Sequence, residues 1–248
     1  MSEQRRVRTG AGIPPATDRV RVRRLPERGR YDRATIDAVL DAALIGHVGY
    51  VVDGQPFVTP TAVWRSGDRL YWHGSSASRM LRATQDAGTV CVTATLVDGL
   101  VLARSGFNHS MNYRSVMVLG RAALVTGDDG RLEALRSFVE HLFPGRWAQL
   151  RAPTRLELKA TTILWTSLDE ASVKVRTGGP HDDPGDESWP VWVGIVPIGR
   201  HVGSAVPDPG LVADLVAGLA GPVISAWLDQ PGTWTDGGAG VAAGEPGP

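Results

Sequence analysis

The sequence predicts a mainly β protein, a β-barrel with peripheral helices, and three observations lead to this class. Short stretches that alternate apolar and polar residues recur along the 248-residue chain, and turn signals separate them. Stretches with helical spacing are few and do not alternate with the strands. No Gly-x-Gly-x-x-Gly motif follows a strand, which argues against a Rossmann fold. Six or seven antiparallel strands would form a barrel of roughly 150–170 residues.

The first elements expected are one helix and three strands. Alternation predicts strands over 47–52, 56–64 and 69–73, and Asp53-Gly54 is a strong hairpin signal between the first two. The helix is expected from Asp32, a potential cap, because apolar residues recur at helical spacing at Ile36, Val39, Leu40, Ala43 and Leu44.

The middle of the chain is expected to add a short helix and three strands. The helix carries Met80, Leu81, Thr84 and Ala87 on one face and stops at Gly88. A strand over 89–97 is followed by a turn at Asp98-Gly99 and a return strand over 100–103. After a polar loop, a long strand spans 114–125, in which Gly120 suggests a bulge or bend.

The remaining elements are a helix with Leu132, Leu135 and Phe138 on one face, a strand over 161–168 and a last strand within 189–198. Residues 1–30 are rich in Arg, Pro and Gly and are expected to form a basic disordered or loosely docked arm. The barrel domain then covers 31–200. Residues 201–248 form a tail that is largely disordered, with one weak helix expected within 207–220.

Composition excludes several classes of protein. The net charge is zero, so a grip on nucleic acid through overall basicity is not expected. The basic arm could contact an acidic partner or could be a solvated tail. The lone Cys91 lies in an apolar run, permits no disulfide within the chain and fits a reducing compartment. Without a signal peptide or a long apolar run, we expect a cytoplasmic protein with no membrane contact.

A group of polar residues lies where the strand over 69–73 meets the following helix. Ser75, Ser76 and Ser78 supply hydroxyls, Arg79 supplies a charge with several donors, and helix N-termini attract phosphate. The corner is therefore a candidate phosphate site. In the alternative interpretation Ser76 is only a helix cap and Arg79 is a solvated helix residue.

His73 precedes this corner, and two interpretations remain open. It could act in catalysis, since its ordinary pKa suits proton transfer near neutral pH. It could equally be a hydrogen-bonded structural residue at a strand end. The six histidines are scattered and form no paired metal-binding spacing, so no metal site is expected. No Gly-x-Ser-x-Gly elbow occurs either, which gives no support to a serine hydrolase.

Taken together, "RLYWHGSSASRMLRA", "NYRSVMVLGRAALV" and "LFPG" resemble the flavin-binding split-barrel superfamily related to pyridoxamine 5′-phosphate oxidase, in the branch with the 5-nitroimidazole reductases. The resemblance covers about residues 30–200. It implies a homodimer of six-stranded Greek-key barrels with FMN at the subunit interface. It also implies a role for His73 at the flavin face as the candidate catalytic residue.

The same resemblance assigns the cofactor contacts. The backbone of one strand would follow the edge of the flavin ring, two aromatic side chains would close its side, and the serine corner would hold the phosphate. An arginine and a serine would lie near the flavin at the dimer interface, and a tryptophan near the ring. The residues are Pro60, Thr61, Ala62, Val63, Trp72, His73, Gly74, Ser75, Ser78, Arg79, Arg114, Ser115 and Trp192.

Two departures separate the sequence from true pyridoxamine phosphate oxidase. The strand before the corner carries no basic residue until Arg65, and the C-terminal Arg-x-His segment is missing. We therefore expect an FMN-dependent oxidoreductase that acts on a small planar substrate and takes electrons from a nicotinamide, with deazaflavin or haem as less favoured cofactors. The alternative is a carrier or sensor that holds a flavin or haem without turnover.

Overall fold

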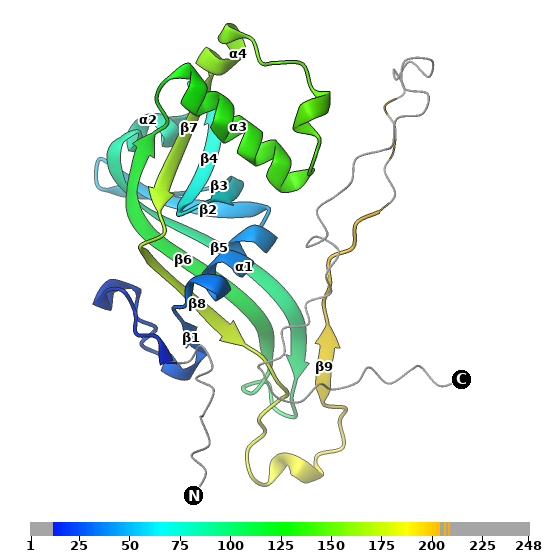
Figure 1. The fold of residues 1–248 in the computed structure, drawn as a ribbon. Helices are drawn as coiled ribbons and strands as arrows, with labels where there is room; N and C mark the ends of the chain where they lie inside the picture. The colour runs from blue at the N-terminus through cyan, green and yellow to red at the C-terminus, as the bar shows by residue number, and fades with distance from the viewer. Residues whose placement is uncertain (1–11, 204–205, 207, 209–248) are drawn as a thin grey trace, which may run out of the picture.

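A computed structural model describes residues 12–203, 206 and 208, and it is built around a closed six-stranded barrel (Figure 1). The barrel strands are β2 (Ile45–Val52), β3 (Gln55–Ser66), β4 (Arg69–Ser75), β5 (Asp86–Leu102), β6 (Ser110–Leu124) and β7 (Thr161–Ser167). All pairings are antiparallel in the order β6-β7-β4-β3-β2-β5, and a β5–β6 pairing closes the ring.

The connectivity is a Greek key. Strands β2, β3 and β4 follow one another as hairpins, and β5 returns to lie beside β2. Three short strands extend the sheet beyond the ring: β1 (Gly29–Arg30) and β8 (Glu170–Arg176) beside β6, and β9 (Gly194–Pro197) beside β5. The predicted mainly β class and six-stranded Greek-key barrel are thus confirmed.

Alternation along the strands builds the core. Leu70 and Trp72 of β4, Val48 of β2 and Val118 of β6 point into the barrel and are fully buried. The helix α1 (Arg33–Ala42) adds Ile36, Val39 and Leu40 to this core, and α2 (Arg79–Thr84) adds Met80 and Leu81. As predicted, the Asp32 carboxylate caps α1 by accepting a 2.8 Å hydrogen bond from the Thr35 amide.

The helix α3 (Asp128–Leu142) covers the outer face of β3, β4 and β7. Its Ala134 packs with Trp64 and Ile163 in a second cluster, and Phe138 borders that cluster. The Trp64 indole nitrogen donates a 2.9 Å hydrogen bond to the Ser137 hydroxyl, which ties β3 to the helix. A short helix, α4 (Arg155–Ala160), which the sequence analysis missed, leads into β7.

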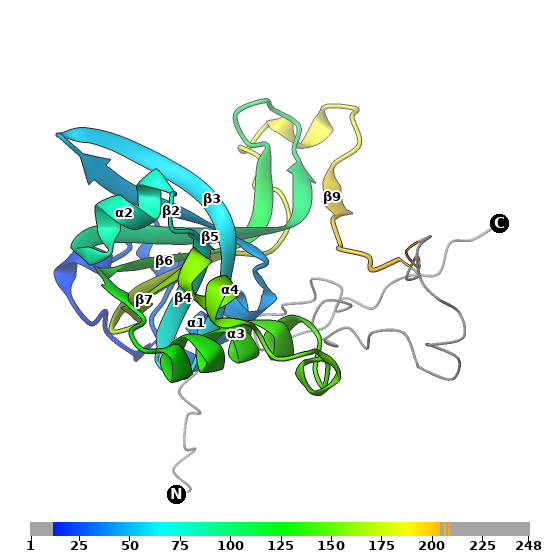
Figure 2. The same cartoon turned by 90° about the horizontal axis from the view of Figure 1, so that it is seen from above.

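Strands β5 and β6 continue beyond the barrel as an arm, which we define as residues 98–112 and 177–198 (Figures 1 and 2). The predicted turn at Asp98-Gly99 is wrong, because β5 runs through it with a bulge between Val97 and Gly99. Glycine at position 99 allows β5 and β9 to pack closely, because a Cβ there would lie 3.0 Å from a methyl carbon of Ile195 in β9. Packing against β9 therefore keeps the chain extended where the local sequence favours a turn.

Three other expectations need correction. The second helix ends at Thr84 rather than Gly88, because β5 already begins at Asp86. Strand β8 was missed, although it is buried between β6 and the N-terminal segment. The expectation of a disordered arm is wrong for residues 12–30, because β1 pairs with β8 and Val20 is fully buried. Most of the predicted tail, with its weak helix, lies outside the described residues.

Gly120 is a site of close approach rather than a bulge. It pairs in register with Val90, and the register shifts of β5 and β6 lie elsewhere. A Cβ at this position would lie 2.1 Å from the Thr166 hydroxyl oxygen of β7, which is fully buried. Glycine is required because the Thr166 side chain occupies the space that a Cβ would need.

We expect Gly120→Ala to destabilise the fold by about 1–3 kcal/mol, the usual cost of forcing atoms into a packed core. Gly179→Ala is the matched control, since a Cβ there meets nothing within 4 Å. Urea denaturation of both variants measures the difference, and equal stabilities would contradict the close approach of β6 and β7.

Candidate functional site

The strands β3 and β4 separate at the place where the cofactor contacts were predicted. They pair only from Val63 opposite Trp72 to Ser66 opposite Arg69. Continued pairing would place Pro60–Ala62 opposite His73–Ser75, but this ladder is absent from the described part of the chain. Alternate backbone groups of β3 therefore lack a strand partner on this edge, where they can bind a ligand. We call Pro60–Ala62, His73–Ser75 and the start of α2 the open corner.

The serine residues of the open corner have free hydroxyl capacity. Ser78, rather than Ser76, is the N-cap residue of α2, and its side chain makes no capping bond. The Ser75 hydroxyl oxygen accepts a hydrogen bond from the Ala77 amide, which leaves its proton for another acceptor. Because α2 has only six residues, a ligand here depends on side chains more than on the helix dipole.

Gly74 lets the helix approach the strand closely. A Cβ at Gly74 would lie 3.1 Å from a methyl carbon of Leu81, which is buried in the barrel core. The close contact sets the start of α2 against the end of β4, and it positions Ser78 and Arg79 beside Ser75.

Arg79 is a cation that an aromatic ring holds in place. Its guanidinium lies 4.1 Å from the centre of the Phe57 ring. Within the described residues it forms no ion pair, whereas Arg65 on the same strand as Phe57 binds Asp41 through two hydrogen bonds of 2.9 and 2.6 Å. The stacking pre-orients the Arg79 donors for an anion. Phe57 was not identified from the sequence, because nothing in the strand pattern relates it to Arg79.

His73 faces the outer side of β4, beneath α3. Its imidazole lies 4.9 Å from the Phe138 ring and 5.5 Å from the Trp64 ring, both in edge-on geometry. Burial among these rings lowers the pKa of His73. Its Nδ1 atom is buried and has no hydrogen-bond partner among the described residues. The side chain is therefore a neutral, partly desolvated imidazole with unused hydrogen-bonding capacity.

Two predicted residues have side chains that a ligand cannot reach from the open corner. Trp72 is fully buried and Val63 is 2% exposed, and both belong to the barrel core. Neighbouring strand residues point to opposite faces, so the position of His73 on the outer face, beneath α3, requires Trp72 to point inward. The expectation that the Trp72 side chain closes one side of the flavin is wrong for this conformation, in which the residue supports the fold.

Three more predicted residues lie far from the open corner of the same chain. Arg114 and Ser115 are separated from Pro60 by two intervening strands, β5 and β2, because the register runs from β6 through Thr93 and His47 to Pro60, which is about 14 Å across three strand spacings. Arg114 makes a buried bidentate pair with Asp98, with bonds of 2.9 and 2.7 Å. Trp192 is 64% exposed on the arm. One chain alone thus does not bring all the predicted contacts together.

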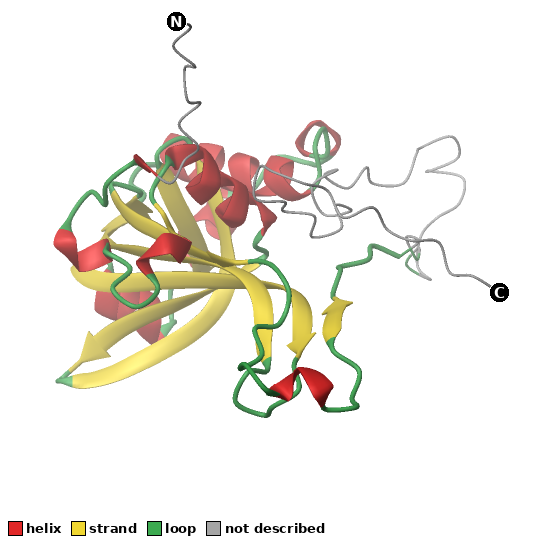
Figure 3. Cartoon of the chain, turned by 90° about the horizontal axis from the view of Figure 1, so that it is seen from below, coloured by secondary structure: helices red, strands yellow, loops and turns green. Residues whose placement is uncertain are grey.

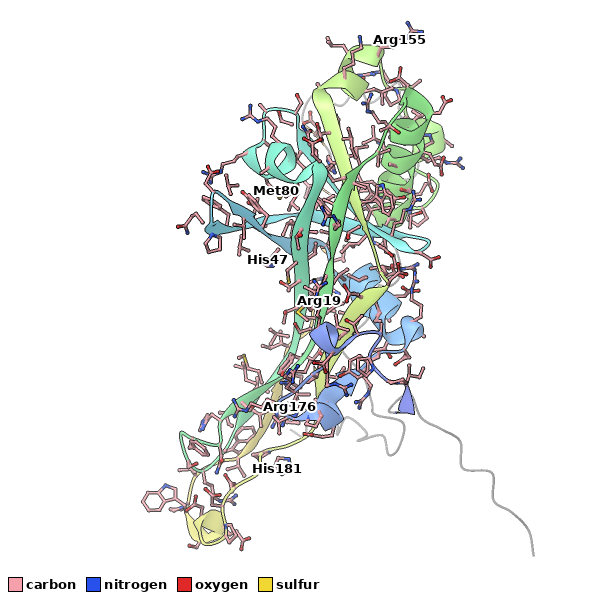
Figure 4. All side chains as sticks on the ribbon, turned by 90° about the vertical axis from the view of Figure 1, so that its left-hand side faces the viewer. Arg19, His47, Met80, Arg155, Arg176 and His181 are labelled. Carbon is pink, nitrogen blue, oxygen red and sulfur yellow. The ribbon has the colours of Figure 1, made fainter. Side chains whose placement is uncertain are left out.

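Figure 4 shows this division of the molecule. Met80 and His47 lie in the barrel half, whereas Arg176 and His181 lie on or beside the arm. The loop that carries His181 is fixed by a 2.6 Å ion pair between Arg104 and Asp182. In the described part of the chain no group of three potential metal ligands occurs, and no helix there is long and apolar enough to cross a membrane.

The closed ring, the open corner and the Greek-key order define the class of protein as a split barrel. The family model described as pyridoxamine 5′-phosphate oxidase matches residues 32–175. The chain belongs to this family. No protein of curated function matches it.

Solved structures place the chain within the family. It is similar to the flavocytochrome Anf3 from Azotobacter vinelandii, with 46% identity, a TM-score of 0.77 and coverage of 82% of this chain and 94% of that one. It is also similar to the FAD- and haem-binding protein from Mycobacterium smegmatis, with 34% identity, a TM-score of 0.73 and coverage of 79% and 94%. A proposed 5-nitroimidazole antibiotic resistance protein from Bacteroides thetaiotaomicron shares the fold at 20% identity, with a TM-score of 0.51 and coverage of 59% and 86%.

The coverage distinguishes these relatives. The match to the flavocytochrome covers 82% of this chain, which is about 203 of its 248 residues. Only 175 residues lie before the end of the family model at Val175, so the match must include residues after it. The likeness to the flavocytochrome therefore extends into the segment after the family model ends, which includes part of the arm. The match to the proposed antibiotic resistance protein covers 59% of this chain, which can be reached without any residue after Val175.

The buried His73 gives a testable dependence of stability on pH. As pH falls below 6.5, the unfolded chain takes up a proton at His73 that the folded imidazole, with its lowered pKa, does not. The free energy of unfolding should therefore fall, and His141, whose pKa burial also lowers, adds to the decrease. His73→Phe should reduce the slope of unfolding free energy against pH from 6.5 down to about 5.

Urea titrations at several pH values measure this slope. The variant His73→Phe/His141→Phe should show a smaller slope than either single variant. A slope unchanged by His73→Phe would mean that the imidazole is protonated as easily in the folded protein as in the unfolded chain.

Proposed function

We propose that this protein binds a flavin at the open corner and serves as a flavin-dependent oxidoreductase for a small planar substrate. The single observation that carries the proposal is the Arg79 guanidinium, which forms no ion pair with any described residue and is held over Phe57 beside Ser75 and Ser78. Relatives named for flavin chemistry support it, since one of them is a flavocytochrome at 46% identity and another binds FAD. The missing basic residues of pyridoxamine phosphate oxidase argue against vitamin B6 as the substrate.

Each part of the open corner has a role in this proposal. Ser75, Ser78 and Arg79 would hold a flavin phosphate, and the unpaired backbone edge at Thr61 and Ala62 would bind the polar edge of the ring. A bound flavin would supply hydride and electron transfer. His73, neutral because of burial, would accept or donate a hydrogen bond at the ring and so orient the substrate.

A second copy of the chain would complete the site. The outer faces of β2, β5 and β6 form one uncovered surface, on which His47, Thr93 and Met117 lie in register. Apolar side chains are exposed around it, among them Val51 at 61%, Val58 at 67% and Met111 at 51%. Such a surface is typical of an interface between protein chains. The Arg114, Ser115 and Trp192 side chains of one chain lie away from its own open corner. In a homodimer, Arg114, Ser115 and Trp192 of the partner subunit would instead reach the flavin.

Arg79→Ala tests the phosphate contact. Loss of one charge-assisted hydrogen bond should weaken flavin binding by about 1.5–3 kcal/mol, measured by titration of the flavin-free protein. The matched control is Arg69→Ala, since Arg69 also lies over an aromatic ring, 3.9 Å from the centre of Trp165, at the other end of β4. Equal dissociation constants for Arg79→Ala and the wild type would exclude this phosphate site.

Turnover separates an oxidoreductase from a carrier. A nicotinamide should bleach the flavin absorption, and a quinone or nitroaromatic compound should restore it. His73→Gln should leave the flavin bound and slow this reoxidation. Bleaching that only oxygen reverses would favour the carrier or sensor.

We also infer haem as a second candidate group, because the likeness to two relatives named for haem or cytochrome extends past Val175. Purified protein supplied with haem should then show a Soret band in addition to the flavin bands. Replacing the six histidines one at a time should identify an axial ligand as the variant that loses this band. Haem that remains unbound after its addition would exclude the second group.

A further inference from the structure

A cavity of about 420 Å³ lies between α3 and the outer faces of β4 and β7, and we call it the α3 cavity. Tyr71 of β4 and Trp165 of β7, which lie opposite each other in the strand register, form one side of it. Gly130 and Ala134, four residues apart on one face of α3, form the other side. The volume is within the range of small-molecule sites, about 300–1,000 Å³.

The α3 cavity is separate from the open corner. Arg69 at the start of β4 lines the cavity, whereas Ser75 of the open corner ends the same strand six residues later, about 20 Å away along an extended chain. Figures 2 and 3 show α3 and the tip of the β2–β3 hairpin on opposite sides of the barrel. The cavity shares no lining residue with the open corner or with the tip of that hairpin.

Arg69 is the cation of the α3 cavity that an aromatic ring holds in place. Its guanidinium lies 3.9 Å from the centre of the Trp165 ring. Within the described residues Arg69 forms no ion pair, and the carboxylate next to it in the chain, Asp68, instead binds Arg33 at 2.6 Å. Since stacking uses the face of the guanidinium, the N–H donors at its edge remain able to bind an anion.

We propose that the α3 cavity binds a small aromatic monocarboxylate. The carboxylate would accept two parallel hydrogen bonds from the planar fork of Arg69. Leu124, Val125 and Ala134 supply apolar walls that would cover the aromatic body of the ligand. One acidic residue, Glu133, also lines the cavity, and its negative charge disfavours a ligand that carries a second negative charge.

Calorimetric titration of the purified protein with 2-naphthoate tests the site. The matched control ligand is 2-naphthamide, which has nearly the same shape and no charge. Naphthoate should bind about tenfold or more tightly than the amide, the difference made by one charge-assisted contact. Arg69→Ala should weaken naphthoate binding by about tenfold or more and leave amide binding within about twofold.

Gly130→Leu is a second variant that acts on shape rather than charge. A Cβ at Gly130 would lie 3.4 Å from a methyl carbon of Val125, an ordinary contact, so the larger side chain can be accommodated by entering the cavity. This variant should weaken the binding of both ligands. Arg69 and Gly130 are exposed positions, and circular dichroism checks that each variant remains folded.

The outcomes separate this inference from the proposed function, because no flavin takes part in the titration. Absence of naphthoate binding, or equal affinities for naphthoate and the amide, would overturn the carboxylate site. Binding that survives both Arg69→Ala and Gly130→Leu would also overturn it. Naphthoate binding that is lost in Arg79→Ala and retained in Arg69→Ala would assign the ligand to the open corner instead, again against the α3 cavity.

Discussion

The separation of β3 from β4 beyond Val63 and Trp72 is the constraint on which the candidate site depends. A barrel normally satisfies its backbone by pairing every strand on both sides, and a free edge carries unpaired amides and carbonyls. Here the edge is left open over Pro60–Ala62, and α2 packs beside it through the contact of Leu81 with Gly74. The fold thus creates a place where backbone, hydroxyls and one arginine face the same ligand volume.

Four arginines of the protein show two different ways of holding a cation. Arg65 and Arg114 are held by carboxylates in partly or fully buried pairs, where loss of one partner would leave an uncompensated charge. Arg79 and Arg69 instead stack on aromatic rings. Arginines of the first kind stabilise the fold. Arginines of the second kind keep their donors available, and Arg79, unlike Arg69, combines this with neighbouring serine hydroxyls and an open strand edge.

The environment of His73 explains why an aromatic cluster and a candidate catalytic residue occur together. Trp64 and Phe138 attach α3 to the barrel, and the same rings desolvate the imidazole. Because desolvation disfavours the charged form, packing and protonation are coupled at this residue. A helix that covers the outer face of the barrel therefore also sets the chemical state of the side chain nearest the site.

The local features of this protein follow from residues that are neighbours in the chain. Periodicity located the barrel strands and α1, and Asp32 marked the helix start, because side-chain alternation and capping depend on neighbouring residues alone. The serines and Arg79 were predicted as one group for the same reason, because they are close together in the chain. Other features depend on partners that are distant in the chain, and the sequence pattern did not predict them. These include the continuous β5 through Asp98-Gly99, the ordered segment 12–30, the inward side chain of Trp72, and the stacking of Arg79 on Phe57, since contacts between distant segments override local preference.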